Sequence, residues 1–273
     1  MTYVAELPQR GVIVLTGEDR VSFLQGLVSN DVAGAVPGAA VWAALLTPQG
    51  KWLADFFILS DGGRLWLDAE RAQIPMLVPR LSRYRLRARV TVEVAAAYRV
   101  FAAWGGPPPE AGIAAPDPRL PEAGWRLLAT DPPPCNATDS DWDAHRLALG
   151  LPDGSRDMET EKTVLLEAGF DELSGVSWSK GCYMGQELTA RTKYRGLVKR
   201  RLVPVTVAGA APAPGSAILR DGIDLGIMRS QRDGIGMAVL RLDALRPGTV
   251  LTCDGATLTP RVPAWMRLPG PTS

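Results

Sequence analysis

Hydrophobic and polar positions in the first sixty residues alternate between strand-like and helix-like patterns. Residues 11–16, GVIVLT, form a short apolar run that predicts a strand. Residues 19–32 predict a helix, because apolar side chains recur there at helical spacing, at Val21, Leu24, Leu27 and Val28. Residues 41–47 and 51–59 then predict a hairpin that turns at Pro48-Gln49-Gly50.

The next eighty residues continue the mixture of helix and strand. Residues 72–84 predict a helix interrupted by Pro75 and Pro79, and residues 87–94 and 98–104 predict strands. Prolines then cluster between about residues 105 and 139, with one strand-like piece, GWRLLAT, between them. We interpret this segment as an ordered crossover between subdomains.

Two further helices and a set of short strands complete the pattern. Residues 140–150 predict a helix with Asp139 or Ser140 as N-cap and Gly150 as its end, and residues 185–195 predict another. After residue 201 the strands are short, and Asp-Gly pairs separate them at Asp221, Asp233 and Asp254. Asp-Gly is a strong hairpin signal, so this region predicts a small antiparallel barrel or sandwich.

The expected fold class is therefore α+β. We expect an α+β region over residues 1–200 and a β-barrel over residues 201–273.

Composition narrows the class of protein. The formal net charge is +1 and charged residues make up 22%, which argues against a general nucleic-acid or membrane-surface protein. The N-terminus lacks the pattern of a signal or transit peptide, and no apolar run approaches the roughly 20 residues of a membrane span. The three cysteines are odd in number and widely spaced, unlike a disulfide framework. We expect a cytoplasmic protein.

The stretch SWSKGCYMGQE is the main candidate for chemistry. Cys182 lies between Gly181 and Gly185, with Lys180 upstream and a predicted helix downstream. The thiolate is the reactive form of cysteine, and positive charge or a helix N-terminus favours it. We therefore predict that Cys182 is a functional thiolate and Lys180 its charged neighbour. The alternative is a buried cysteine that packs as a small hydrophobic residue.

The residues present disfavour a Cys-His catalytic pair and a metal site formed by this chain alone. His145 is the only histidine, and it lies in an amphipathic helix where we expect a structural role. The chain has no CxxC motif, so no tightly bound metal is expected, and any cluster contact of Cys182 would be transient.

Basic residues are concentrated in two segments. Arg83, Arg85, Arg87 and Arg89 recur at period two, so a strand would place them on one face. Residues 191–201 carry six more basic side chains, beginning at Arg191. Such segments suit an anionic ligand, a polyglutamate tail or an RNA backbone, and the alternative is a solvated basic surface.

Two acidic residues stand in apolar surroundings. Asp55 interrupts KWLADFFIL, and Glu167 lies in TVLLEAGF. A buried carboxylate is costly unless it is paired, so we expect Asp55 to pair with an arginine. Glu167 could equally accept two hydrogen bonds from the N–H edge of a guanidine-like ring.

The motif KGCYMGQE resembles the signature of the YgfZ-type folate-binding proteins, which help to mature [4Fe–4S] proteins. That family is related to the T-protein (aminomethyltransferase) of the glycine cleavage system. The resemblance extends over most of the chain, with LLEAGFDELSGVSWSKGCYMGQELTARTKYRGLVKRRL as its most specific block. The signature comprises Cys182 and its neighbours Lys180, Gly181, Tyr183, Gly185, Gln186 and Glu187.

The resemblance implies interwoven α+β folate-binding subdomains, a C-terminal barrel, and tetrahydrofolate as the small molecule. It assigns Glu167 to the pterin edge and places Asp55 where T-proteins keep their key acid. We expect the folate tail near the arginines, among them Arg85, Arg87 and Arg191.

The favoured hypothesis is a tetrahydrofolate-binding accessory factor that works with the iron–sulfur assembly machinery or its client proteins. One alternative is a folate-dependent aminomethyltransferase, although Ala54 stands where T-proteins commonly have a second acid. The other is an RNA-interaction module linked to tRNA modification, which near-neutral charge disfavours. Whether the protein is an enzyme is left open.

Overall fold

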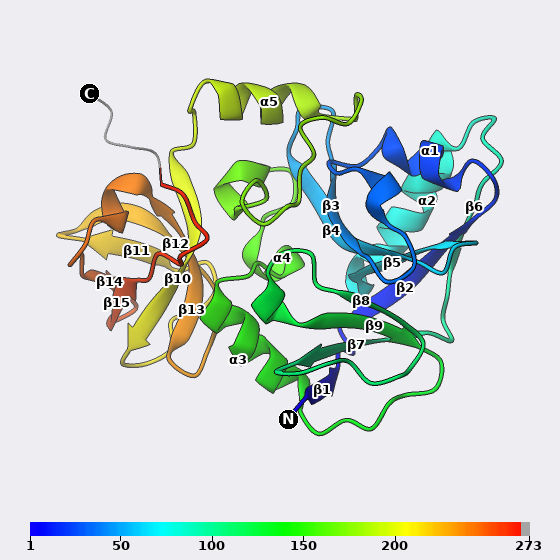
Figure 1. Ribbon diagram of the computed structural model, residues 1–273. Coiled ribbons are helices and arrows are strands. Elements are labelled where there is room, and N and C mark those ends of the chain that lie inside the picture. The colour runs from blue at the N-terminus through cyan, green and yellow to red at the C-terminus, as the bar shows by residue number, and fades with distance from the viewer. Residues whose placement is uncertain (269–273) are drawn as a thin grey trace.

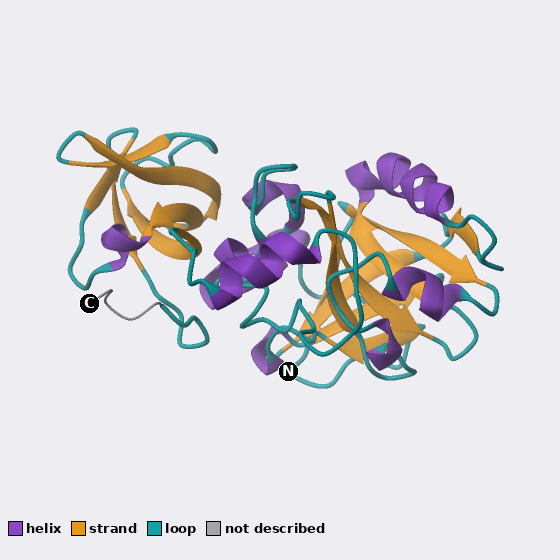
Figure 2. Cartoon of the chain, turned by 90° about the horizontal axis from the view of Figure 1, so that it is seen from above, coloured by secondary structure: helices purple, strands orange, loops and turns teal. Residues whose placement is uncertain are grey.

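The computed structural model describes residues 1–268, and these residues build two antiparallel sheets and a closed barrel joined by short helices. Figure 1 shows the sheets on one side, the barrel on the other and helices α3 (Asp139–Leu149) and α4 (Gly154–Asp157) between them. The view from above in Figure 2 shows the same division. The prediction of an α+β region followed by a small antiparallel β-barrel is confirmed.

The larger sheet has five strands in the order β3-β4-β5-β2-β6. Their bounds are β2 (Arg10–Thr16), β3 (Val41–Leu46), β4 (Trp52–Ser60), β5 (Leu65–Glu70) and β6 (Thr91–Val94). Every residue of β3 and β4 is buried, because both faces of the sheet are covered. This explains why the two strands read as continuous apolar runs.

Different elements cover the two faces of this sheet. One face packs against α1 (Arg20–Gln25) and α2 (Ile74–Tyr84), which contribute Leu24, Leu77 and Leu81 to its core. The other face packs against the short 3-10 helix η4 (Leu165–Ala168), and its core also contains residues of α3. Alternate residues of each strand therefore face two separate cores.

The smaller sheet shows how the α+β subdomains interweave. Its order is β1-β7-β9-β8, so the chain begins in this sheet, builds the larger one and then returns. The bounds are β1 (Tyr3–Glu6), β7 (Arg99–Trp104), β8 (Ile113–Pro116) and β9 (Trp125–Ala129). The proline-rich segment therefore contains two strands, of which sequence analysis identified β9.

The barrel closes in the order β10-β13-β12-β11-β14-β15. Its bounds are β10 (Arg200–Ala208), β11 (Ala217–Arg220), β12 (Ile223–Arg232), β13 (Ile235–Arg241), β14 (Leu251–Cys253) and β15 (Ala256–Pro260). Asp221, Asp233 and Asp254 all have positive φ, as do the glycines that follow them. Two successive positive φ values define the type I′ hairpin turn, so the Asp-Gly prediction is confirmed.

Two predicted helix ends need correction. The N-cap of α3 is Thr138, whose side chain forms a capping box with Asp141, in place of the expected Asp139 or Ser140. Helix α1 ends at Gln25, short of the helical pattern that extends to Val28.

Among residues 1–268, no helix has the length and apolar character needed to cross a bilayer.

The predicted arginine strand is also wrong. Helix α2 tolerates Pro75 at its first turn and Pro79 in its interior and continues to Tyr84. Arg83 therefore lies in the last helical turn and Arg85 is the C-cap. Arg87 follows in a turn, and strand β6 begins only at Thr91. Arg83, Arg85 and Arg87 therefore follow one another at period two in the end of a helix and the turn after it, instead of in a strand.

Candidate functional site

The loop that precedes α5 (Gln186–Tyr194) presents Cys182 to solvent. Cys182 and Gly181 are both exposed, and the position of a Cβ on Gly181 would meet no other atom within 4 Å. Residues on either side of Cys182 are, in contrast, held by contacts with distant parts of the chain. We call residues 177–185 the signature loop.

Lys180 anchors the first half of the signature loop. Its ammonium group donates hydrogen bonds to the carbonyl oxygens of Gln25, Val28 and Asn30, at 2.5, 2.7 and 2.9 Å. These carbonyls lie at and just beyond the C-terminus of α1, where helical carbonyls lack partners. Burial lowers the pKa of Lys180 to about 8, and the carboxylate of Asp31 opposes that shift. Lys180 thus fixes the loop to the end of α1, and its influence on the Cys182 thiol stays a prediction.

Tyr183 and Met184 anchor the second half. Tyr183 is buried, and burial raises its pKa to about 12. Its backbone N–H donates to the Oε1 atom of Gln186 at 2.9 Å, which assigns Gln186 a role in shaping the loop. The hydroxyl of Tyr84 donates to the sulfur of Met184 at 3.6 Å, so the end of α2 touches the loop.

A contact between two glycines seats α5 on the β3–β4 turn. Gly185 is the N-cap of α5 and has φ +79°, and a Cβ there would lie 2.5 Å from the carbonyl oxygen of Thr47. A Cβ on Gly50 would lie 2.7 Å from the carbonyl oxygen of Gly185. Only glycine satisfies both the left-handed conformation and this backbone approach. Glu187 is exposed in the first turn of the helix.

The remaining cysteines and the histidine differ from Cys182. Cys253 is buried in the barrel, whereas Cys135 is exposed and donates to the carbonyl oxygen of Pro133. The ring of His145 stacks on Trp104 and its Nε2 atom lies 2.9 Å from the carbonyl oxygen of Glu122, as expected of a structural residue. Within residues 1–268, no group of three or more His, Cys, Asp or Glu side chains is placed to hold a metal ion.

Glu167 lies in η4 and lines a pocket of about 130 Å³ between this helix and the barrel. Lys162, Arg200 and Arg229 line the same pocket together with Asp157 and Glu159, and Glu159 pairs with both Lys162 and Arg229. Burial raises the pKa of Glu167, and the charges of Lys51, Arg200 and Arg201 oppose the shift. Within residues 1–268 the Glu167 carboxylate has no hydrogen-bond partner, so it is free to accept hydrogen bonds from a ligand.

Asp55 is buried in β4 and lies on the same face of the sheet as η4. Its two oxygens accept hydrogen bonds from the indole N–H groups of Trp42 and Trp52, at 2.9 and 3.2 Å. The expected pairing with an arginine is therefore wrong: within residues 1–268 Asp55 forms no ion pair. Burial raises the pKa of Asp55 to about 6, and the charge of Arg10 opposes that shift.

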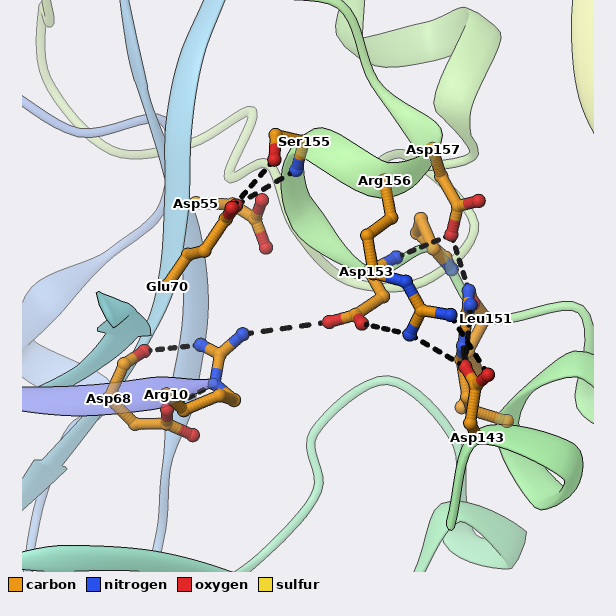
Figure 3. Close-up of polar contacts among 12 residues, drawn as sticks. Arg10, Asp55, Asp68, Glu70, Asp143, Leu151, Asp153, Ser155, Arg156 and Asp157 are labelled. Carbon is orange, nitrogen blue, oxygen red and sulfur yellow. Dashed lines mark hydrogen bonds and ion pairs between the residues drawn. The ribbon is translucent and has the colours of Figure 1, made fainter. Parts of the chain in front are cut away.

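A buried network of charges surrounds Asp55, as Figure 3 shows. Arg10 pairs with Asp68, and its Nη1 atom lies 3.7 Å from Asp153, which also pairs with Arg156 at 3.1 Å. The carboxylate of Glu70 accepts hydrogen bonds from the N–H and hydroxyl of Ser155. These contacts fix α4 against the larger sheet.

The structure separates the predicted folate residues into two groups. Asp55 and Glu167 share one side of the larger sheet, since Trp42 stacks on Phe170 just beyond η4, with ring centres 3.9 Å apart. Arg85 and Arg87 follow α2, which packs on the opposite face. A folate tail near Arg85 and Arg87 stays a prediction, as does folate binding by Glu167. Arg191 is exposed on α5.

Sequence analysis missed several residues of the site. Trp42 and Trp52, the partners of Asp55, depend on strand register, which no local pattern revealed. Lys51 and Arg229 approach Glu167 from a hairpin turn and from the barrel. Lys51 could have been singled out from the sequence, because it directly follows the predicted glycine turn of the hairpin.

Comparison with known proteins agrees with this architecture. The family model of the CAF17 C-terminal beta-barrel domain matches residues 199–268. The mitochondrial iron–sulfur cluster assembly factor IBA57 of Homo sapiens is 32% identical over 298 residues, covering 95% of this chain and 84% of the human protein. The chain belongs to the IBA57 family.

Other relatives extend the IBA57 comparison. The IBA57 homolog of Mycosarcoma maydis is 35% identical over 240 residues, covering 79% of this chain and 60% of the fungal protein. The chain therefore spans less than two thirds of that relative. The predicted resemblance to YgfZ-type proteins is confirmed at the level of the family. The relatives are named as mitochondrial, and a cytoplasmic location for this chain stays a prediction.

The fold also matches a solved T-protein. The glycine cleavage system aminomethyltransferase T from Bartonella henselae superposes with a TM-score of 0.76, covering 97% of this chain and 86% of that chain. The sequence identity is 15%, so the match concerns the fold alone. The IBA57-family chain thus has an aminomethyltransferase-like fold.

Proposed function

We propose that this protein is an iron–sulfur cluster assembly factor in which Cys182 offers its thiolate to iron of a cluster in transit. The observation that carries the proposal is the contrast within the signature loop. Cys182 is exposed, while Lys180 and Tyr183 on either side are anchored. A thiol held in solvent on a fixed loop is accessible to a macromolecule that carries a cluster, whereas a buried thiol is not. Membership of the IBA57 family supports the same role.

The proposal is tested in cells that lack the protein. We expect activity of enzymes that depend on [4Fe–4S] clusters to fall in these cells and to return when this chain is supplied. Enzymes without a cluster serve as the control and should keep their activity. Full activity of the cluster-dependent enzymes without the protein would contradict the proposed function.

The second part of the proposal is that Glu167 binds the head group of tetrahydrofolate. A pterin ring presents adjacent N–H donors, and the Glu167 carboxylate is half-buried and free of partners within residues 1–268. The pocket, at about 130 Å³, is smaller than the roughly 300–1,000 Å³ of sites for drug-sized ligands. It therefore suits the ring, with the rest of the folate outside.

Glu167→Gln tests this part of the proposal. The amide keeps the shape of the side chain but loses the charge-assisted hydrogen bonds, worth about 1.5–3 kcal/mol. We expect the Kd for tetrahydrofolate to rise roughly ten- to a hundredfold, measured by quenching of the tryptophan fluorescence. Glu110→Gln, at an exposed glutamate, should leave the Kd unchanged. Equal affinities for wild type and Glu167→Gln would remove the folate role of Glu167.

A further inference from the structure

Two basic segments meet at the signature loop. The first is the turn between α2 and β6, where Arg83, Arg85 and Arg87 are exposed and make no ion pair within residues 1–268. The second is α5 and the residues after it. Residues 186–201 contain six basic side chains and one acid, Glu187, a net charge of +5. Two of the six are paired, Lys193 with Asp171 and Arg201 with Glu172, which leaves Arg191, Arg195, Lys199 and Arg200 exposed and without an ion pair within residues 1–268. The whole chain carries a net charge of only +1, so unpaired positive charge is concentrated here.

The contact between Tyr84 and Met184 joins these segments. Tyr84 immediately precedes Arg85, and Met184 is the second residue after Cys182. Both side chains pack into the same core, on the face of the larger sheet that α1 and α2 cover. Figure 1 shows α5 running from the signature loop towards the barrel, while α1 and α2 lie on the other side of that loop. The signature loop, which carries Cys182, therefore leads directly into α5 and contacts the end of α2 through Met184.

Exposed apolar side chains interrupt the basic residues. Leu86 is 89% exposed and has φ +44°, a conformation that costs a non-glycine residue roughly 1–2 kcal/mol. On α5 and beyond it, Tyr194 is 74% exposed and Leu197 is 44% exposed. Leu86 directly follows Arg85, the C-cap of α2, so its left-handed backbone ends the helix, and the N–H of Ala88 donates to the carbonyl oxygen of Arg85 across the turn. The leucine side chain itself stands in solvent between two arginines.

We propose that residues 83–87 and the exposed face of α5 form a docking surface for an acidic partner protein, which brings its cluster to Cys182. The inference rests on the proposed function and adds where the partner binds and what its surface must offer. The unpaired arginines require carboxylates opposite them, and Leu86, Tyr194 and Leu197 require apolar contacts.

Charge and geometry favour a protein over the other anionic partners. Arg85 and Arg87 follow α2, on the opposite face of the larger sheet from Glu167. RNA binding by a single strand would use aromatic side chains between the basic ones as stacking platforms. The α2–β6 turn instead exposes a leucine, whose shape suits an apolar pocket on a protein.

Photo-crosslinking identifies the partner. A benzophenone amino acid is placed at Leu86, and at Val250 as a control, since Val250 is also exposed but lies near the barrel end. The protein captured only from Leu86 is then purified and titrated against the wild-type chain. We expect that protein to have an acidic surface and its binding to weaken as salt rises. RNA adducts at Leu86, or the absence of a protein adduct, would overturn the proposal.

Charge reversal measures the contribution of the arginines. With the purified partner, Arg85→Glu/Arg87→Glu should raise the Kd at least about tenfold at low salt, because like charges then face each other. Arg246→Glu/Arg261→Glu makes the same change in net charge at exposed positions outside the docking surface, and should change the Kd less than about twofold. Equal effects of the two double variants would refute a specific surface.

The same variants in cells separate the two proposals. If Cys182→Ser abolishes maturation and Arg85→Glu/Arg87→Glu lowers it, both proposals stand. If the charge-reversed chain retains full activity while Cys182→Ser fails, the docking surface is wrong and the proposed function survives. If Cys182→Ser is also fully active, the proposed function itself fails.

Discussion

Cys182 and Glu167 are held by the protein in opposite ways. Cys182 stands in solvent because its neighbours Lys180 and Tyr183 are tied to α1 and to the core. Glu167 is half-buried in a small pocket between η4 and the barrel, and burial raises its pKa. An exposed group on a fixed loop suits a large partner, whereas a carboxylate in a pocket suits a small molecule.

The two regions are also stabilised by different kinds of contact. The signature loop depends on backbone contacts: three carbonyls around one ammonium group, and two glycines in close approach. On the side of the larger sheet that Asp55 and Glu167 share, charged side chains join helix α4 to the sheet, with Asp153 between Arg10 and Arg156. Variants of the two glycines should therefore change stability with little dependence on pH. Lys180, whose pKa is lowered to about 8 by burial, and Asp55, whose pKa is raised to about 6 by burial, should each shape the pH profile.

The largest effect is expected from Gly185→Ala. The added methyl group combines a left-handed conformation with a clash against the carbonyl oxygen of Thr47, and together these cost about 2–6 kcal/mol. Urea unfolding measures the loss. Gly196→Ala is a matched control, because Gly196 has φ +59° but a Cβ there meets nothing within 4 Å. A loss at Gly185 no larger than that at Gly196 would show that the contact with the hairpin is unimportant.

Lys180→Met should have the next largest effect. It leaves the carbonyls of Gln25, Val28 and Asn30 without their common donor, and the loss of charge-assisted hydrogen bonds costs about 2–3 kcal/mol. Hydrogen exchange should become faster in residues 25–30 and 177–185. Lys199→Met, at an exposed lysine, should change stability by less than about 0.5 kcal/mol. Unchanged exchange in both segments would argue that Lys180 does not anchor the loop.

The smallest effect on stability is expected at Asp55. Its pKa is raised from 3.8 to about 6, so the folded protein binds this proton more tightly than the unfolded chain does. Stability from this group is therefore present below pH 4 and is lost as pH rises to about 6. Compared with Asp55→Asn, the wild type should lose about 1.4 kcal/mol more between pH 5 and pH 8. A difference between the two proteins that is constant with pH would contradict the raised pKa.

Features with local causes were predictable from sequence. The barrel hairpins follow from Asp-Gly pairs such as Asp233-Gly234, where both residues adopt positive φ. Helix α5 begins and ends within one residue of the predicted bounds. The exposure of Cys182 fits the signature motif. In each case the residues that determine the feature are close in sequence.

Features that depend on distant contacts were not predictable. Lys180 is bonded to carbonyls about 150 residues away, so sequence analysis assigned its charge to Cys182. Asp55 was predicted to pair with an arginine, because nothing local reveals that the β3–β4 pairing brings the indole of Trp42 within hydrogen-bond distance of it. The predicted strand through the arginines before β6 was wrong for a different reason. A period of two over a few residues is a weak strand signal, and helix α2 continues through two prolines into this segment.

The most direct test of the central claim compares two exposed cysteines. Cys182→Ser and Cys135→Ser each replace a solvent-exposed thiol by a hydroxyl of similar size, so both variants should fold normally. They are expressed in cells lacking the protein, and [4Fe–4S] enzyme activity is measured against the wild-type chain. We predict that Cys182→Ser gives activity close to that of cells without the protein, and that Cys135→Ser restores it fully. Full activity with folded Cys182→Ser would contradict the account.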